Sequence, residues 1–408
     1  MATVALGTPY RRLLSATLLS NLGDGIRAAA FPLLAATLTR DPVLISGVAI
    51  ATQLPGVLLA LPAGSLADRF DRRRIVVVAD AIRLAFLFGL VCLIASGWAT
   101  MSVLFVVVFV SGATDVVRAT AAGTLVPSLV PLEHLDRANG RMVTAEIAGT
   151  EFIGPPLGGL LFGLAVVLPF AVNGGTLALA VALVASIPAL LQTPDTAPGP
   201  GTPRRRPARS AAGVHWLLEH RGFWPVPATS AALAVTDSAW FTLLVLYVQQ
   251  VLHLSSAWYG ILLAVGAVGG LSGGFLAAAL TRRIGAKLTT LTCLALAALG
   301  QLALGATSST AATAAVLASS SMAFAIWTVQ ARTAIQSAVP AELLGRVISI
   351  NRAVITAASL LGAALGGLTA DRLGLHAPFL LGIPILLVAA LLIAANRDTS
   401  SRDTGHHG

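Results

Sequence analysis

Two stretches of this 408-residue chain decide its fold: Gly64-Ser65-Leu66-Ala67 followed by Arg72-Arg73, and Gly274-Phe275-Leu276-Ala277 followed by Arg282-Arg283. The second stretch repeats the first at an offset of 210 residues, which is half the chain. Two further pairs lie near that offset: Gly154-Pro155-Pro156-Leu157-Gly158-Gly159 with Gly362-Ala363-Ala364-Leu365-Gly366-Gly367 at 208 residues, and Asp24 with Asp237 at 213. The three pairs together predict a duplicated unit.

The composition of the chain excludes a water-soluble protein. Charged residues make up 11% of the chain, whereas soluble globular proteins contain about 25%. Apolar residues make up 56% and the mean hydropathy is +0.85. Because so few charges cannot cover a water-facing surface, most of the exterior must face lipid. These values exclude a cytosolic enzyme, a secreted domain and a disordered regulator, and they predict an all-α polytopic membrane protein.

Apolar segments of about 20 residues, the length that crosses a bilayer, occur throughout the chain. We expect 12 transmembrane helices in two pseudo-symmetric six-helix bundles. A proline-rich polar stretch divides the chain into residues 1–192, a linker at 193–222 with a short amphipathic helix, and residues 223–408. The expected spans are 13–38, 43–66, 75–97, 101–126, 141–163, 166–191, 224–250, 257–280, 287–306, 310–337, 347–370 and 375–395.

The basic residues lie almost entirely on one side of these spans. Of 26 Arg and Lys residues, 19 fall in one alternate set of connections, 2 in the other set and 5 inside spans. Basic loops remain cytoplasmic, so we expect both termini in the cytoplasm of a bacterial plasma (inner) membrane. The net charge of +9 then faces anionic membrane lipids, and no nucleic-acid partner is expected.

Several motifs resemble one transporter family over nearly the whole chain. The loop Gly64-x-Leu66-Ala67-Asp68-Arg69-x-Asp71-Arg72-Arg73-Arg74 resembles the signature between spans two and three of the major facilitator superfamily. The stretch 20–27 is similar to the first span of its enterobactin-exporter and macrolide-efflux-like branch, and Gly154, Pro155, Gly158 and Gly159 resemble the exporters' antiporter motif. The resemblance implies two six-helix bundles around a central cavity. Thr281 departs from it, because an acid would stand there in a full second loop signature.

The loop signature predicts a cytoplasmic gate. Asp68 would lie near the start of span eleven, close to Arg346, where the positive end of that helix attracts a carboxylate. The alternative is ordinary positive-inside topology without a gate. The motif residues are Gly64, Asp68, Arg69, Asp71, Arg72 and Arg73.

The antiporter-like motif predicts a bent span five, since Pro155 and Pro156 remove two backbone donors. The surrounding glycines predict close packing against span eight at Gly266, Gly270 and Gly274. Helix packing alone would explain the same residues.

Charged groups inside spans are candidates for function, because each one costs at least about 2.5 kcal/mol at mid-membrane when unpaired. Asp24 and Arg27 lie one turn apart near the middle of span one, and Asp115 and Arg118 repeat this spacing in span four. Asp24 could exchange a proton or form a permanent ion pair with Arg27. For Asp80 and Arg83 a structural ion pair is expected. The proton-coupling candidates are Asp24, Glu151 and Asp237, and the substrate-cavity candidates are Asn21, Arg27, Asp115, Arg118, Trp240, Trp327, Gln330 and Arg332.

No catalytic, metal-binding or cofactor-binding pattern is expected to be functional. His215 and His220 lie on different faces of a helix, and no phosphate-binding Gly-x-x-x-x-Gly-Lys run is present. We therefore expect a monomeric secondary transporter that exports a hydrophobic or amphipathic small molecule, such as a drug, antibiotic or siderophore-like metabolite, in exchange for protons. An importer or facilitator of a nutrient remains an alternative, as does a lipid-handling or receptor-like protein without solute flux.

Overall fold

The computed structural model describes residues 7–59, 62–63, 66, 70–123, 125–131, 134–187 and 211–395. Every regular element within these ranges is helical, as the composition predicts. The elements are, in chain order, α1 (Thr8–Leu38), α2 (Pro42–Leu58), α4 (Arg72–Ala95), α5 (Met101–Gly123), α6 (Val126–Leu129), α7 (Leu135–Ile147), the π-helix η2 (Ala148–Ile153), α8 (Gly154–Leu164), α9 (Leu168–Ala185), α10 (Ala211–Glu219), the 3-10 helix η3 (Arg221–Phe223), α11 (Pro225–Phe241), α12 (Leu244–Leu246), the π-helix η4 (Tyr247–Val251), α13 (Ser256–Ile284), α14 (Ala286–Ala306), α15 (Thr310–Ala338), α16 (Ala341–Leu373) and α17 (Ala377–Ala395).

Ten helical segments of the described chain are long and apolar enough to cross a membrane. Each of the 12 predicted ranges overlaps a helix of the described residues, and the prediction of an all-α polytopic membrane protein is confirmed. Two predicted spans are not among the ten. The helix α1 is 31 residues long but carries charged side chains near its middle, and α2 extends for 17 residues.

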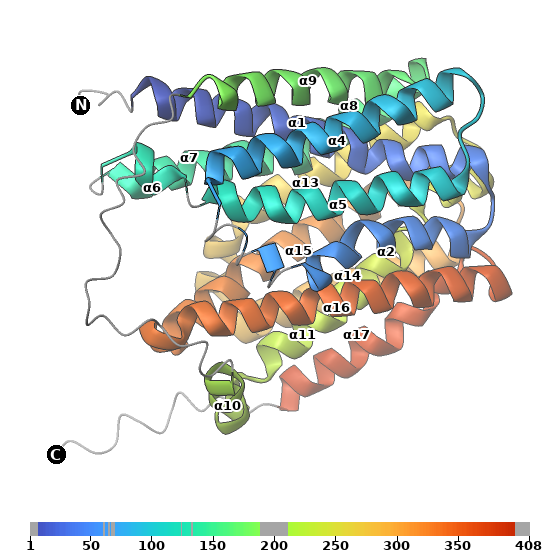
Figure 1. Ribbon diagram of the computed structural model, residues 1–408. Helices are drawn as coiled ribbons and strands as arrows, with labels where there is room; N and C mark the ends of the chain where they lie inside the picture. Colours follow the sequence, from blue (N-terminus) through green and yellow to red (C-terminus); the bar gives the residue numbers. More distant parts are fainter. Residues whose placement is uncertain are drawn as a thin grey trace. The chain divides into compact units, whose positions relative to one another are not determined.

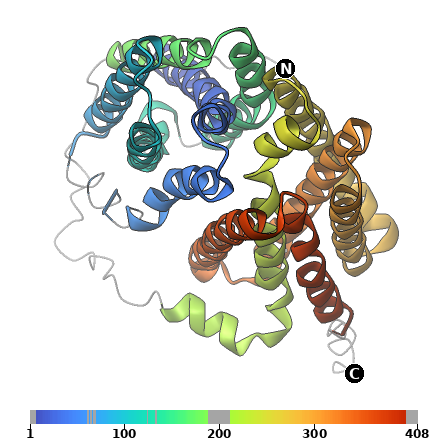
Figure 2. The same ribbon diagram turned by 90° about the vertical axis from the view of Figure 1, so that its right-hand side faces the viewer.

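The chain forms two compact units, each with its own helix contacts. Unit 1 comprises Met1–Thr202 and Leu244–Ala264, and unit 2 comprises Pro203–Leu243 and Val265–Gly408. In unit 1, α1 packs against α8 and α9, and α4 packs between α5 and α9 (Figure 1). In unit 2, α11 packs against α16 and α17, and α14 against α15 and α17; α11 lies beside the red α16 in Figure 2. The predicted domain boundaries stay a prediction.

Pro155 and Pro156 lie inside the continuous helical stretch Arg137–Leu164, as predicted for span five, in the first turn of α8. The π-helix η2 directly before them interrupts the regular α-helix. Such single π-turns occur frequently at functional sites, and this one contains Glu151.

Glycines of one helix lie against the backbone of a neighbouring helix at corresponding positions of the two units, and we call each such contact a glycine seam. In unit 1 a Cβ on Gly158 would collide with the carbonyl oxygen of Ile26, and in unit 2 a Cβ on Gly366 would collide with that of Ala239. The two glycines are 208 residues apart and their partners 213, which are offsets of the internal repeat. Gly362 approaches Val235 in the same way, so α16 and α11 run parallel. In both units, glycines let helix backbones approach closely.

The predicted glycine contacts between spans five and eight are wrong in detail. Gly159 of α8 lies against Gly260 at the start of α13, within unit 1. Gly266 and Gly270 instead face Ser321 of α15, and a Cβ on Gly274 would meet nothing within 4 Å. The α13 glycines therefore serve two different seams, because opposite ends of that helix pack in different units.

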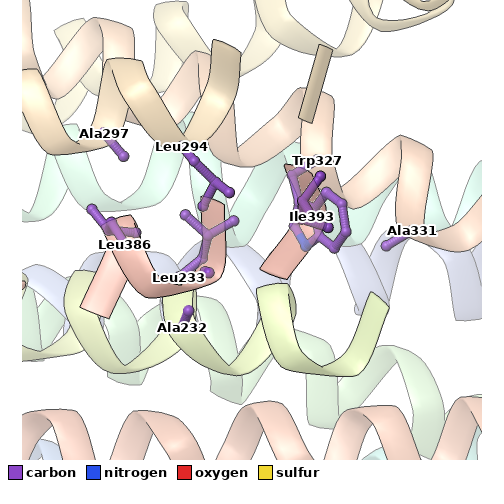
Figure 3. Packing of buried hydrophobic residues seen from close by; sticks show 9 residues of the cluster. Ala232, Leu233, Leu294, Ala297, Trp327, Ala331, Leu386 and Ile393 are labelled. Atoms are coloured by element: carbon purple, nitrogen blue, oxygen red, sulfur yellow. The ribbon is translucent and has the colours of Figure 1, made fainter. Parts of the chain in front are cut away.

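Unit 2 has an apolar core where α11, α14, α15 and α17 meet. Figure 3 shows Leu233 of α11 and Leu294 of α14 beside Leu386 of α17, with Trp327 of α15 nearby. The full cluster contains Ala232, Leu233, Leu294, Ala297, Trp327, Ala331, Leu386, Ala389 and Ile393. This packing contains no charged side chain.

The helix α10 lies where an amphipathic helix was predicted within the linker 193–222. Trp216 and Leu217 are buried against Val339 and Val347 of unit 2, whereas His215 and Glu219 form an exposed pair at 2.9 Å. The linker residues 193–210 lie outside the described ranges.

Candidate functional site

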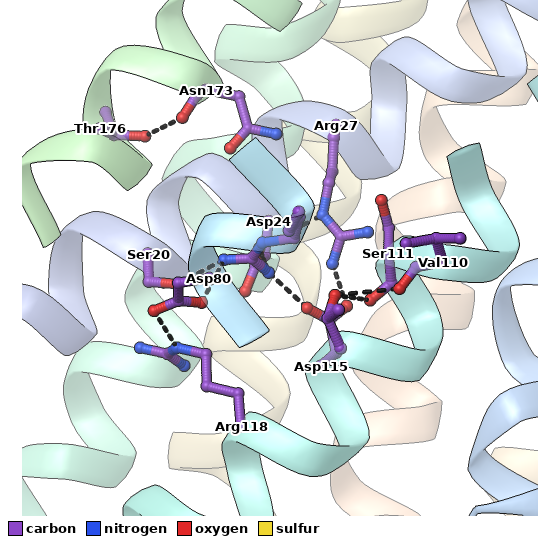
Figure 4. A network of polar contacts seen from close by, with 12 residues as sticks. Ser20, Asp24, Arg27, Asp80, Val110, Ser111, Asp115, Arg118, Asn173 and Thr176 are labelled. Atoms are coloured by element: carbon purple, nitrogen blue, oxygen red, sulfur yellow. Dashed lines mark hydrogen bonds and ion pairs between the residues drawn. The ribbon is translucent and has the colours of Figure 1, made fainter. Parts of the chain in front are cut away.

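A charge network lies at the centre of unit 1, where α1, α4 and α5 meet (Figure 4). Each helix contributes an aspartate and an arginine three residues later. Asp24 stands one residue past the midpoint of α1, so the network lies deep within the bundle. We call these six residues, Asp24, Arg27, Asp80, Arg83, Asp115 and Arg118, the charge network.

Arg83 of α4 is the hub of the charge network, with its side chain only 1% exposed. Its Nη1 donates to Asp24 Oδ1 at 2.7 Å and to Asp115 Oδ1. Its Nη2 donates to Ser20 Oγ at 2.9 Å and to Asp80 Oδ1 at 3.3 Å. One guanidinium therefore joins all three carboxylates and ties α4 to α1 and α5.

Arg27 closes a ring of four charges. Its Nε donates to Asp24 Oδ1 at 3.2 Å, and its Nη2 donates to Asp115 Oδ2. Asp24 and Asp115 thus each bridge Arg27 and Arg83. A proton on either carboxylate would leave two guanidiniums sharing the other one.

Asp80 connects Arg83 to Arg118 of α5. Its Oδ2 accepts from Arg118 Nε at 3.1 Å while its Oδ1 accepts from Arg83, and its side chain is 1% exposed. Every carboxylate of the network therefore contacts two guanidiniums, and the three negative and three positive charges balance. Pairing and hydrogen bonding of this kind offset the cost of taking charges out of water.

The charge network was only partly predictable. The Asp24–Arg27 pair and the structural role of Asp80 and Arg83 agree with the expected ion pairs. Asp115 and Arg118 do not pair with each other, because their side chains reach across to α1 and α4. The central position of Arg83 was missed, although its spacing from Asp80 inside an apolar span was the signal for it.

Unit 2 has an aspartate at the position equivalent to Asp24 but no arginine at the position equivalent to Arg27. Asp237 of α11 corresponds to Asp24 at an offset of 213 residues, and the same offset takes Arg27 to Trp240. Asp237 is partly buried, and Trp240 follows it by one turn of α11. The glycine seam supports this alignment, since Ile26 and Ala239 hold equivalent places with the same offset.

The other predicted cavity residues lie in separate places. Asn21 of α1 is buried beside Gly149 of η2. Trp327 donates through Nε1 to Ser230 Oγ at 3.3 Å inside the apolar core. Gln330 donates to Thr281 Oγ1 at 3.0 Å and so ties α15 to α13, while Arg332 is exposed.

The predicted gate and antiporter-like residues have structural contacts where they are described. Asp71 accepts from the backbone N–H of Arg73 at 2.9 Å and caps the start of α4. Arg73 donates to the carbonyl oxygens of Val184, at 3.2 Å, and Ala185 at the end of α9. Glu151 is exposed on η2. Gly64, Asp68 and Arg69 lie outside the described residues.

Comparisons with known proteins agree with this architecture. The model of the Major Facilitator Superfamily matches residues 13–358. The multidrug efflux pump Tap of Mycobacterium tuberculosis is 29% identical over 402 residues, covering 94% of this chain and 93% of that protein. The MFS-type transporter YfiS of Bacillus subtilis is 26% identical, covering 96% and 94%.

Solved structures of transporters share the fold. A bacterial homologue of the iron transporter ferroportin, in an inward-facing state, superposes with a TM-score of 0.73 at 18% identity and covers 97% of this chain and 99% of its own. The nucleoside transporter NupG, as its D323A mutant, gives a TM-score of 0.73 at 12% identity and covers 95% and 100%. With the family match over most of the chain, the protein is a membrane transporter rather than an enzyme, and it belongs to the major facilitator superfamily.

Proposed function

We propose that this protein exports a hydrophobic or amphipathic small molecule across the bacterial inner membrane by alternating access, in exchange for protons. The similarity to a multidrug efflux pump over 94% of the chain supports the direction of transport. The distribution of Arg and Lys supports cytoplasmic termini. A monomer surrounded by anionic lipid is sufficient for this activity.

The contrast between the two central carboxylates carries the proposal of proton coupling. Asp24 is held by Arg27 and Arg83 and has no need of a proton, so we assign it the ion-pair role. Asp237 forms no ion pair in the described chain, and Trp240 stands at the position that Arg27 holds in the repeat. A carboxylate in apolar surroundings without a cation is stabilised by binding a proton. We therefore place the exchangeable proton on Asp237 rather than on Asp24 or Glu151.

The gate remains part of the proposal. Asp68 of the loop signature would hold the cytoplasmic side closed, and Arg73 of the same motif donates to the carbonyl oxygen of Val184 at the end of α9. An Asp68→Asn variant that is made at normal levels and transports at the wild-type rate would remove the gate from the mechanism.

The function is tested with everted inner-membrane vesicles that contain the protein. An imposed pH gradient, acid inside, should drive ethidium into the vesicles, and an uncoupler should abolish the accumulation. Vesicles without the protein are the control. Accumulation that is insensitive to the uncoupler would contradict proton coupling, and movement only in the opposite direction would indicate an importer.

A further inference from the structure

The helix α10 lies across one end of unit 2 instead of running along it. In Figure 1 the long helices run across the page and α10 is seen nearly end-on, whereas in Figure 2 the long helices are seen end-on and α10 lies in the plane of the page. The two views agree that the axis of α10 crosses the direction of the membrane-spanning helices. A helix in this orientation lies along the membrane surface.

An aromatic cluster fixes the corner between α10 and α11. The ring of Trp216 stacks on His220 at 4.3 Å with an interplanar angle of 17°, and it meets the edge of Phe223 at 5.3 Å. The ring nitrogen Nδ1 of His220 also lies 2.8 Å from the backbone oxygen of Trp216. We call α10 and residues 220–224 the α10 corner. Because this corner is packed, α10 holds one orientation relative to the rest of unit 2.

The helix α10 has three kinds of face. Trp216 and Leu217 are buried against unit 2, at 8% and 9% exposed. His215 and Glu219 form the exposed pair on a second face. At about 100° per residue, Leu218 points away from the buried face and to one side of the His215–Glu219 pair, and it is 54% exposed. An apolar side chain in this position is typical of a helix that inserts one face into a membrane surface.

A second large apolar side chain is exposed in the α10 corner. Trp224 is the residue directly before α11, and it is 47% exposed. Tryptophan accumulates at the level of lipid headgroups, because its ring is apolar and its Nε1–H is a hydrogen-bond donor. About half of Leu218 and half of Trp224 are thus left uncovered by the described part of the chain.

The end of unit 2 that carries the α10 corner is basic. Arg346 is exposed and directly precedes Val347, which belongs to the same buried cluster as Trp216. The other exposed basic side chains described at this end are Arg282 and Arg283 of α13 and Arg332 of α15. The exposed acidic ones are Glu219, which already pairs with His215, and Glu342. The excess of positive charge complements a surface of anionic lipid headgroups.

We propose that the α10 corner binds the anionic surface of the lipid bilayer, with Leu218 and Trp224 inserted among the headgroups and the His215–Glu219 pair facing water. The basic side chains attract the lipid phosphates, and the two apolar side chains hold the helix at headgroup level. Because α10 packs on α16, this contact anchors the first turns of α16 to the membrane surface. The inference depends on neither the direction nor the coupling of transport.

Fluorescent labels on the full chain test the inference in vesicles. A chain without its native cysteines, Cys92→Ser/Cys293→Ala, receives one new cysteine, Leu218→Cys, Trp224→Cys or Glu219→Cys, and a nitrobenzoxadiazole label. Each protein is reconstituted into vesicles of phosphatidylcholine with phosphatidylglycerol that contain a nitroxide lipid. The labels at 218 and 224 should shift their emission to the blue and lose fluorescence to the nitroxide. The label at 219, the matched control, should show neither effect, because it faces water.

The lipid composition separates the possible outcomes. In vesicles of phosphatidylcholine alone, quenching at 218 and 224 should fall toward the level at 219, and equal quenching in both kinds of vesicle would overturn the anionic surface as the partner. Quenching at 218 and 224 no stronger than at 219 with phosphatidylglycerol present would overturn the membrane contact. A blue-shifted label that nitroxide lipids do not quench would also overturn it, since protein would then cover this face. The two labelled positions are independent should one variant fail to fold, and neither result bears on export.

Discussion

Trp240 occupies in α11 the position that Arg27 occupies in α1, one turn after the aspartate, and Arg27 donates to Asp24 Oδ1 at 3.2 Å. Because Trp240 has an indole where Arg27 has a guanidinium, Asp237 lacks the ion pair that Asp24 forms within its own helix. Asp24 belongs to a balanced set of six charges, whereas Asp237 forms no ion pair with any of the described residues. The internal repeat thus supplies one structural carboxylate and one that is available for exchange.

Neutralising the two aspartates should affect transport differently. Asp24→Asn leaves Arg27 and Arg83 paired with Asp115, so vesicles should keep pH-driven ethidium accumulation when the signal is normalised to folded protein. Asp237→Asn should lose it by at least about tenfold, because no other site takes up the proton. The same loss in Asp24→Asn, with Asp237→Asn active, would assign the coupling to unit 1 instead.

The stability of the protein should depend on the balance of charges in the charge network as well as on its packing. Arg83→Gln leaves three carboxylates with two guanidiniums and should destabilise the protein by about 3–5 kcal/mol. The double variant Asp80→Asn/Arg83→Gln restores equal numbers of charges and should recover part of that loss. Thermal unfolding in detergent of the two single variants and the double variant measures the coupling. Strictly additive effects would mean that the network does not act as one electrostatic unit.

The glycine seams should be intolerant of a single methyl group. Gly158→Ala and Gly366→Ala each place a Cβ against a backbone carbonyl of the neighbouring helix and should lower stability by about 1–3 kcal/mol. Gly274→Ala is the matched control, since its Cβ would meet nothing within 4 Å. It should be neutral or stabilise the helix by up to about 1 kcal/mol. Equal melting temperatures for all three variants would argue against close packing at the seams.

Two basic residues that follow the positive-inside pattern should contribute to stability at helix ends. Arg73 donates to carbonyl oxygens at the end of α9, and Lys287 donates to Ala394 O at 3.0 Å at the end of α17. Because both contacts are partly exposed, Arg73→Ala and Lys287→Ala should each cost no more than about 1 kcal/mol. A loss of more than this in a melting experiment would show that these residues do more than cap a helix.

The sequence was sufficient to predict the helices, the repeat and the family. Apolar length and the placement of arginines depend on the membrane itself, so they can be read without knowing which helices touch. The i, i+3 spacing also gave the Asp24–Arg27 pair, because both residues lie on one helix. Features that depend on a single helix, such as its length and its i, i+3 ion pairs, were therefore predictable.

Contacts between helices were harder to predict. The bonds from Arg83 to Asp24 and Asp115 join residues 59 and 32 positions apart, and no local spacing indicates them. The seam of Gly159 with Gly260 was assigned to later glycines of α13, since glycine spacing alone does not fix the register of two helices. The equivalence of Arg27 and Trp240 could have been found from the offset of 213 residues, but its meaning depended on knowing which side chains surround each aspartate.

The proton proposed for Asp237 can be measured most directly by the protons released when a transported molecule such as ethidium binds. Purified wild-type protein in weakly buffered detergent solution, with a pH indicator, should release about one proton per bound ethidium. Asp24→Asn protein should release the same number, and Asp237→Asn protein should release none. Ethidium binding to wild type without proton release, or undiminished release from Asp237→Asn, would contradict the account.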